Sequence, residues 1–308
     1  MIGVFVEHDN GTLTEASAEA LTFARDLGEI TAICVGAPDT DALGAHGVGR
    51  VMSAAIDGTY APQAWGAAVA EAAAEASVLL AAGTERGNEV LAHAAIDLDA
   101  PFAANCLSYT DGDALRIRWG GSLHEEATVA APRAVLTVAP HSVEASLASR
   151  PSSPEIVTLS PELSPEALAV RIVDQEEASA GVTLATAKVV VSGGRGVGSA
   201  EGFAALEELA ELLGGKVGCS RVATNNGWRN HADQVGQTGT VIAPELYIAC
   251  GISGAIQHWV GMMASKNILA INTDAEAPMV TKADYAIIGD LHEVLPALTA
   301  AIRAAKGL

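Results

Sequence analysis

Basic residues are scarce in this chain of 308 residues, in which 17 Lys and Arg stand against 37 Asp and Glu and the formal net charge is −20. Such a surface repels phosphate backbones and anionic lipid headgroups. We therefore expect neither nucleic acid nor a membrane surface as a partner. A basic partner protein would suit the charge, although a generally acidic source proteome would produce the same value.

Long uninterrupted apolar runs are also missing, although the mean hydropathy is positive at +0.29. The two most apolar stretches, residues 67–83 and 241–264, are interrupted by charged residues, polar residues or proline: Glu71, Glu75, Pro244, Glu245, Gln257 and His258. A membrane-spanning helix needs about 20 nearly uncharged residues, so no membrane insertion is expected. The N-terminus reaches Glu7 without a basic segment, which is unlike a signal peptide.

Paired cysteines are the third absence, because the four cysteines lie far apart and form no C-x-x-C motif: Cys34, Cys106, Cys219 and Cys250. This spacing indicates neither a zinc site nor an iron–sulfur site. Aromatic residues make up only 4% of the chain. Reduced, scattered cysteines and the lack of a signal sequence favour a cytoplasmic location.

What the chain does have is an apolar fraction of 50% and a regular alternation of strand-like and Ala-rich helical segments. Strands are expected at residues 2–7, 29–35, 51–55 and 78–82, and helices at 15–27, 64–75 and 89–96. The alternation resumes later, with strands expected at residues 188–192, 217–219, 246–250, 268–271 and 285–288 and helices at 200–213, 255–264 and 291–305. This pattern is typical of parallel sheets covered by helices on both faces.

The middle of the chain departs from that pattern. Residues 115–119 and 128–138 resemble strands joined by a Gly-Gly turn, which suggests an antiparallel edge. Residues 142–165 have the Pro and Ser content of a loop, and residues 169–174 are expected to form a further strand. We predict two α/β domains, each an open, mostly parallel sheet: an N-terminal scaffold and subunit-docking domain at residues 1–182 and a Rossmann-like domain at 183–308, with the boundary near residues 175–187.

Several polar motifs follow the strands of the second domain. The turn at residues 192–198, S-G-G-R-G-V-G, lets the backbone approach a ligand, or it is merely a tight turn between strand and helix. The loop at 233–239 has side chains that could bind a heteroaromatic ring, or it is a surface turn. Ser253 could start an anion-binding helix, and His258 could be structural. Asn272 and Asp290 could bind a ligand or cap helices.

These motifs all fall at the carboxyl ends of strands, which meet at one edge of a parallel sheet, where open α/β sheets bind ligands. The glycine turn lacks the G-x-G-x-x-G spacing of dinucleotide sites. It begins like the S-G-G-x-D-S loop of ATP pyrophosphatases but lacks its acid and hydroxyl. An ATP- or NAD-consuming enzyme is therefore disfavoured.

The second domain resembles the FAD domain of the electron transfer flavoprotein α-subunit family between residues 189 and 298. The resemblance rests on the runs S-G-G-R-G, C-S-R, Q-V-G-Q-T-G, A-P-E-L-Y-I-A-C-G-I-S-G-A-I-Q-H, A-I-N-T-D and A-D-Y-A-I-I-G-D-L. F-V-E-H-D-N-G and A-G-T-E-R-G-N-E-V resemble the family's N-terminal domain. Residues 224–231, which include Asn225, Asn226, Gly227 and Trp228, depart from the family pattern and leave the role of this loop open.

The resemblance implies an FAD site in the second domain. By this resemblance, Arg221, Thr238 and His258 would tune the redox potential of the flavin. Positive charge from Arg221 and His258 would favour the reduced, anionic flavin. Alternatively, Arg221 is a surface residue paired with an acid. The implied FAD-binding residues are Arg195, Ser220, Arg221, Val235, Gly236, Gln237, Thr238, Ser253, Gly254, Ala255, Ile256, Gln257, His258, Asn272, Asp290 and Leu291. Such a site needs no catalytic base, because the flavin carries the redox chemistry.

The function implied is that of an electron carrier rather than a substrate-converting enzyme. By resemblance, the chain would pair with an electron transfer flavoprotein β subunit. It would take electrons from flavin dehydrogenases, such as the acyl-CoA dehydrogenases of fatty acid β-oxidation, and pass them to a quinone-linked oxidoreductase. The alternatives are a bifurcating subunit that uses NADH and a non-redox nucleotide-binding interaction module.

Overall fold

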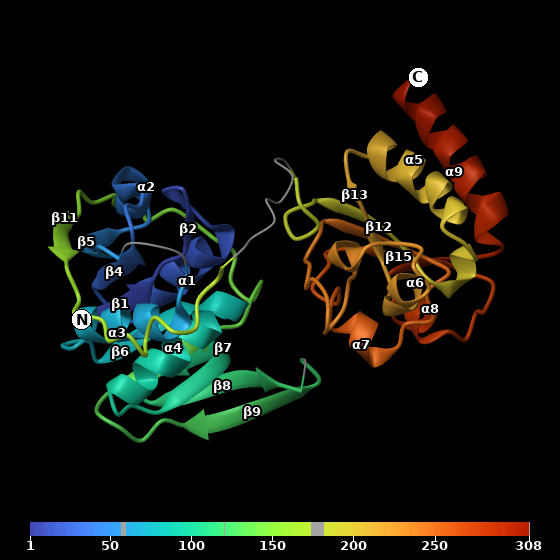
Figure 1. Cartoon of the computed structure of the whole chain (residues 1–308). Helices are drawn as coiled ribbons and strands as arrows, with labels where there is room; N and C mark the ends of the chain where they lie inside the picture. The colour runs from blue at the N-terminus through green and yellow to red at the C-terminus, as the bar shows by residue number, and fades with distance from the viewer. Residues whose placement is uncertain (57–59, 120, 174–181, 308) are drawn as a thin grey trace. The chain divides into compact units, whose positions relative to one another are not determined.

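The computed structural model describes residues 1–56, 60–119, 121–173 and 182–307. The chain divides into two compact units, Met1–Glu176 and Glu177–Leu308 (Figure 1). Each unit contains an open sheet with helices on both faces, which confirms the expected fold class. The expected boundary region at residues 175–187 lies partly outside the described residues.

The N-terminal unit is built on one nine-stranded sheet. Its strands lie in the order β11 (Glu155–Leu159), β5 (Val48–Ala54), β4 (Ile30–Val35), β1 (Ile2–Phe5), β6 (Val78–Ala82), β10 (Ala134–Val138), β7 (Phe102–Thr110), β8 (Asp113–Arg118) and β9 (Leu123–Thr128). The strands from β11 to β7 are parallel, whereas β8 and β9 add an antiparallel edge. A short hairpin of β2 (His8–Asp9) and β3 (Thr12–Leu13) follows β1.

Helices cover both faces of this sheet because successive strand residues point to opposite sides. Val4 and Leu80 pack with α1 (Glu15–Arg25) and α2 (Thr40–Ala45) on one face. Phe5 and Leu79 pack with α3 (Pro62–Ala72) and α4 (Glu85–Asp97) on the other. The central strands β1, β4, β6 and β10 are buried throughout, as expected for parallel strands covered on both faces.

The middle of the chain differs from the sequence prediction in three places. Of the strand expected at 128–138, Thr128 ends β9 and residues 134–138 form β10. The expected strands are not joined directly by the Gly-Gly turn, because β9 lies between β8 and β10 in the chain, and residue 120 of that turn is outside the described part. The loop expected at 142–165 contains β11, which pairs with β5. The strand expected at 169–174 is wrong over the described residues 169–173, where Val170 and Val173 are exposed and no strand forms; residue 174 lies outside the described part.

The C-terminal unit has a five-stranded parallel sheet. Its order is β13 (Lys216–Cys219), β12 (Val189–Gly193), β14 (Leu246–Cys250), β15 (Ile268–Asn272) and β16 (Tyr285–Ile288). One face packs against α5 (Ala204–Leu212), α6 (Arg221–Asn225) and α9 (Leu291–Lys306), and the other against α7 (Ile256–Trp259) and α8 (Pro278–Lys282). The helix expected at 255–264 is therefore only the short α7, followed by turns.

The order of these strands determines where a ligand could bind. The chain passes from β12 to β13 on one side and then returns to place β14 on the other side of β12. In open parallel sheets, ligands bind beyond the carboxyl ends of the strands at such a reversal. A ligand site is therefore expected at the turns that follow β12 and β14. Among the described helices, none has the length and apolar character needed to span a membrane.

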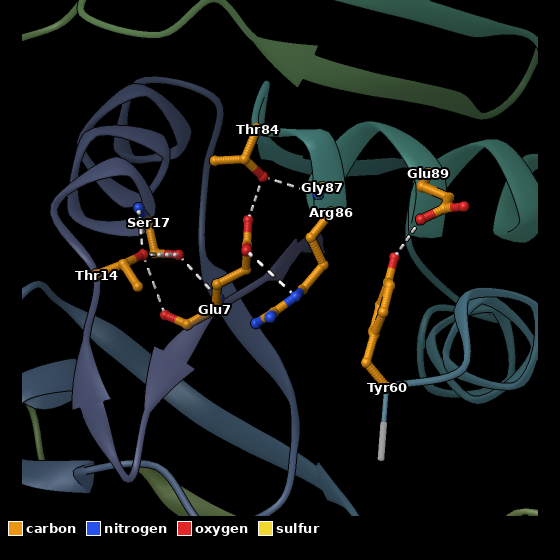
Figure 2. A network of polar contacts seen from close by, with 8 residues as sticks. All are labelled: Glu7, Thr14, Ser17, Tyr60, Thr84, Arg86, Gly87 and Glu89. Atoms are coloured by element: carbon orange, nitrogen blue, oxygen red, sulfur yellow. Dashed lines mark hydrogen bonds and ion pairs between the residues drawn. The ribbon is translucent and has the colours of Figure 1, made fainter. Parts of the chain in front are cut away.

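A polar network fills the corresponding edge of the N-terminal unit, beyond β1 and β6 (Figure 2). The carboxylate of Glu7 accepts a hydrogen bond from Thr84 Oγ1 and lies 3.8 Å from Arg86 Nε. The Arg86 guanidinium also lies 5.1 Å from the ring centre of Tyr60 and 5.6 Å from that of Trp65. These polar groups bind one another, so this edge holds the unit together.

Replacing Glu7 with Gln is expected to change how the stability of the N-terminal unit depends on pH. Burial raises the pKa of Glu7 above its ordinary value of 4.5, and Thr84 and Arg86 offset only part of this effect. The stability gained from protonated Glu7 is therefore complete below the unfolded pKa and is lost as pH rises through the folded pKa. Gln cannot ionise, so the difference in melting temperature between the two proteins should change across this window. A difference that stays constant from about pH 4 to about pH 8 would contradict the prediction.

Candidate functional site

A cavity of about 580 Å³ lies at the carboxyl edge of the C-terminal sheet. Residues that follow each of the five strands line it. The predicted site residues in its wall are Arg195, Ser220, Arg221, Ser253, Gly254, Ala255, Gln257, His258, Asn272, Asp290 and Leu291. The fold therefore brings together side chains that lie far apart in the sequence, because parallel strands end at a common edge.

Sequence reasoning missed part of the wall. The further lining residues are Gly196, Val222, Gly251, Ile252, Thr273, Asp274, Ala277 and Gly289. Most of them are direct sequence neighbours of a predicted residue. Their position just after a strand could therefore have identified them as lining residues. Among the described residues, no group of three or more His, Cys, Asp or Glu side chains could hold a metal ion.

Glycines at the strand reversal allow two turns to touch. The Gly196 N–H donates to the Gly251 carbonyl over 3.0 Å, and the Gly194 N–H donates to the Cys250 carbonyl over 2.9 Å. A Cβ on Gly194 would lie 2.4 Å from the Gly251 oxygen, and one on Gly196 would lie 2.8 Å from the Gly251 Cα. These two glycines are thus explained by turn packing, which was the alternative explanation for the motif. The same packing places Arg195 in the wall of the cavity.

Positive charge lines the cavity without a partner in the described chain. Arg195 begins a short 3-10 turn after β12, and Arg221 is the first residue of α6. Neither guanidinium forms a hydrogen bond or an ion pair with the described residues, although acids outnumber bases twofold. In the same wall, the buried Ser220 Oγ also lacks a hydrogen-bond partner in the described structure. Since buried hydroxyls are usually paired, this group of donors suits an anionic ligand such as a phosphate ester.

The far side of the cavity carries an amide and a carboxylate. Asn272 Nδ2 donates to the Ile252 carbonyl over 3.0 Å, and its Oδ1 accepts from the Asp274 N–H over 3.1 Å. Asp290 caps α9 by accepting from the His292 N–H over 2.9 Å. The helix-capping alternative therefore holds for Asp290, while both side chains also line the cavity.

His258 is buried and uncharged at neutral pH. Its Nε2 lies 2.7 Å from the hydroxyl of Tyr247, a fully buried residue of β14. Burial lowers the pKa of His258 to about 4, and the Val235 backbone opposes this shift only in part. Burial also raises the pKa of Tyr247, which keeps its hydroxyl protonated. The expectation that His258 adds positive charge is therefore wrong for the chain alone. Tyr247 holds His258 in place, and the sequence did not reveal this role because Tyr247 lies within an apolar strand.

The segment at residues 235–238 lies beside the cavity rather than in its wall. Val235 is buried and its N–H donates to the Cys219 carbonyl over 2.9 Å, whereas Gln237 and Thr238 are more accessible. The Gln237 N–H donates to the carbonyl of Gln257, which does line the cavity, over 2.7 Å. The predicted residues that do not line the cavity are Val235, Gly236, Gln237, Thr238 and Ile256.

Comparisons with known proteins agree over nearly the whole chain. Residues 2–164 match the family model described as the electron transfer flavoprotein domain, and residues 183–263 match the electron transfer flavoprotein FAD-binding domain. The chain is 42% identical to the electron transfer flavoprotein subunit alpha of Mycobacterium tuberculosis (strain H37Rv), covering 99% of this chain and 98% of that one. It is 37% identical to the subunit alpha of Paracoccus denitrificans (95% and 97% covered) and 35% identical to Protein FixB of Clostridium saccharobutylicum (97% and 95% covered).

Proposed function

Because the chain belongs to the electron transfer flavoprotein α-subunit family, we propose that it carries electrons from flavin dehydrogenases, such as acyl-CoA dehydrogenases, to a quinone-linked oxidoreductase. The family resemblance seen in the sequence is confirmed, and with it FAD as the cofactor. The family also implies a β subunit as partner, with which the chain would form a heterodimer. We place the complex in the cytoplasm, which the free, buried cysteines support.

The observation that carries this proposal is the convergence of donors on one cavity inside the C-terminal unit. Arg195, Ser220 and the backbone of the turn that includes Ser253 would bind the pyrophosphate of FAD. Asn272, Asp290 and Leu291 would hold the ribityl and adenosine end, and Arg221, Gln237 and Thr238 would face the ring. Bound FAD supplies the redox chemistry, while these residues hold it and set the charge around it.

We assign FAD binding to residues 183–308 and scaffold and docking roles to residues 1–182. The support for the second assignment is the network around Glu7, in which Thr84 and Arg86 are engaged with other residues of the same unit. The C-terminal unit differs, since Arg195 and Arg221 have no such partners in its described residues.

The test is to purify the chain together with its β subunit and record the absorption spectrum. We expect flavin absorbance at one FAD per C-terminal unit. Mixing this complex with a reduced acyl-CoA dehydrogenase should bleach the flavin, and adding an oxidised quinone-linked oxidoreductase with quinone as the final acceptor should restore its absorbance. A colourless complex would refute FAD binding, and a coloured complex that accepts no electrons from the dehydrogenase would refute the proposed donor.

Replacing Arg86 with Ala should leave the flavin spectrum unchanged and lower the stability of the N-terminal unit. The change removes a cation from the rings of Tyr60 and Trp65 and from buried Glu7, which we expect to cost about 1 to 2 kcal/mol. Arg50→Ala is the matched control, because Arg50 pairs with Glu155 on the exposed surface over 2.9 Å and should cost less than about 1 kcal/mol. Thermal unfolding and FAD absorbance together check the prediction, and loss of FAD in the Arg86 variant would contradict it.

A further inference from the structure

Gln234 lies directly before the segment 235–238, and its side chain is buried, at 2% exposure. Its Nε2 donates to the Thr238 carbonyl over 3.0 Å and lies 3.1 Å from Thr238 Oγ1. Its Oε1 accepts a hydrogen bond from Thr224 Oγ1 over 2.8 Å. The single Gln234 amide therefore links Thr224, which lies in α6, to Thr238.

Thr224 continues this connection toward Arg221. It lies one turn further along α6, and its Oγ1 is also 2.9 Å from the Arg221 carbonyl. The Thr224 hydroxyl has one proton, so it donates either to the Arg221 carbonyl or to Gln234 Oε1. When it donates to Gln234, it ties α6 to the amide that holds Thr238. Arg221 and Thr238 are more accessible than Gln234, which is buried.

The backbone around Gln234 is fixed from several sides. The Thr240 N–H donates to the Gln234 carbonyl over 2.7 Å, and Cys219 and Gln234 form a parallel bridge. Just before it, Asp233 accepts from Arg229 Nε over 2.9 Å. A fixed backbone gives the Gln234 amide one position from which to hold Thr238.

Arg229 anchors the loop at residues 224–231, which departs from the family pattern. Its guanidinium pairs with Glu207 of α5 and lies 5.5 Å from the ring centre of Phe203. Gly227, at a φ of +71°, follows α6, and the Trp228 N–H donates to the Ala223 carbonyl over 2.9 Å. These contacts anchor the loop to α5 and α6 a few residues before it reaches Gln234.

We propose that Gln234 is a positioning residue that fixes the Thr238 hydroxyl and the first turn of α6 relative to each other. This inference rests on the proposed function, which places Thr238 and Arg221 at the flavin ring. Gln suits the position because its amide accepts from one hydroxyl while donating to a carbonyl, which an ionised Glu cannot do. Replacing the amide by a carboxylate removes the donor that holds Thr238 and so breaks the link between Thr238 and α6, the helix that begins at Arg221.

The experiment uses the full chain with its β subunit and four variants. Gln234→Glu removes the donors, Thr224→Val removes the link to α6, and Thr224→Ser keeps the hydroxyl. Asn267→Ala is the control, because Asn267 is an exposed amide that donates to the Glu245 carbonyl over 3.1 Å, directly before β15. The measurements are the FAD dissociation constant, the midpoint potential of the bound flavin and hydrogen exchange at residues 237–240 in FAD-free protein.

We expect Gln234→Glu to weaken FAD binding about tenfold, shift the potential and speed exchange at residues 237–240. Thr224→Val should act in the same direction with a smaller change of about threefold. Thr224→Ser and Asn267→Ala should match the original protein. If Gln234→Glu does not fold, the Thr224 pair decides the question.

Unchanged binding, potential and exchange in Gln234→Glu would overturn the inference, as would a Thr224→Ser variant that is as impaired as Thr224→Val. Failure of the proposed function has a different signature, because the unaltered complex would then bind no FAD. In that case the exchange measurement still decides whether Gln234 orders residues 237–240.

Discussion

Replacing Arg221 with Ala is expected to make the bound FAD harder to reduce. Reduction adds negative charge to the flavin, and Arg221 lines the cavity as a cation without a partner among the described side chains. A unit charge about 4 Å from the reduced ring contributes at most about 4 kcal/mol at an effective dielectric constant of about 20. For one electron this corresponds to a fall in midpoint potential of at most about 0.17 V. We expect a shift below this limit, because Arg221 is exposed and solvent screens its charge.

Reductive titration of the holo-complex measures this shift. Arg221→Lys should retain part of the potential, since the charge is kept while the planar guanidinium is lost. Arg303→Ala should leave the potential unchanged, because Arg303 pairs with Glu208 on the outer face of the same unit over 2.8 Å. An Arg221→Ala variant with full FAD occupancy and an unshifted potential would exclude a tuning role for this residue.

Replacing Gly254 with Ala should damage both the stability of the C-terminal unit and its affinity for FAD. Gly254 has a φ of +83°, and a Cβ there would lie 2.4 Å from the Met279 nitrogen and 2.8 Å from the Met279 Cα. These are backbone atoms of α8, held by a 3.1 Å hydrogen bond from the Met279 N–H to the Ser253 carbonyl. Overpacking and the left-handed conformation together should cost about 3 kcal/mol.

Gly198→Ala separates the two causes. Gly198 has a nearly identical φ of +85°, but a Cβ there would meet nothing within 4 Å. It should therefore cost only about 1 kcal/mol, from backbone strain alone, and leave FAD affinity close to that of the original protein. Denaturant unfolding and FAD titration of the two variants provide the comparison. Equal losses in both would show that contact with α8 is unimportant.

Buried central strands were the most predictable part of the fold. The bounds of β6 and β14 match the sequence prediction, because a parallel strand covered on both faces leaves an uninterrupted apolar run. The short elements were missed. The helix α6 has five residues and depends on the packing of Ala223, and β11 is an edge strand within a segment rich in proline. Local sequence alone does not encode such tertiary contacts.

For the candidate site, the location was predictable from the sequence but the charge of one residue was not. Its location followed from the shared edge of the strands, so Arg195 and Asp290 could be placed in one cavity from sequence. The charge of His258 could not be predicted, since it depends on burial beside Tyr247. The link from Gln234 to Thr224 could not be predicted either, because it requires the return of the loop to β13.

The position of β10 in the N-terminal sheet has a consequence for synthesis of the protein. This strand, Ala134–Val138, lies between β6 and β7, both of which precede it in the chain. The strands on either side of β10 therefore cannot join into one sheet until β10 has emerged from the ribosome, and the parallel pairings form slowly because they join distant residues. Each unit has its own hydrophobic clusters, so the first can finish folding while the second is still being translated. If FAD binds in the C-terminal unit, as we propose, its capture belongs to the last stage of biogenesis.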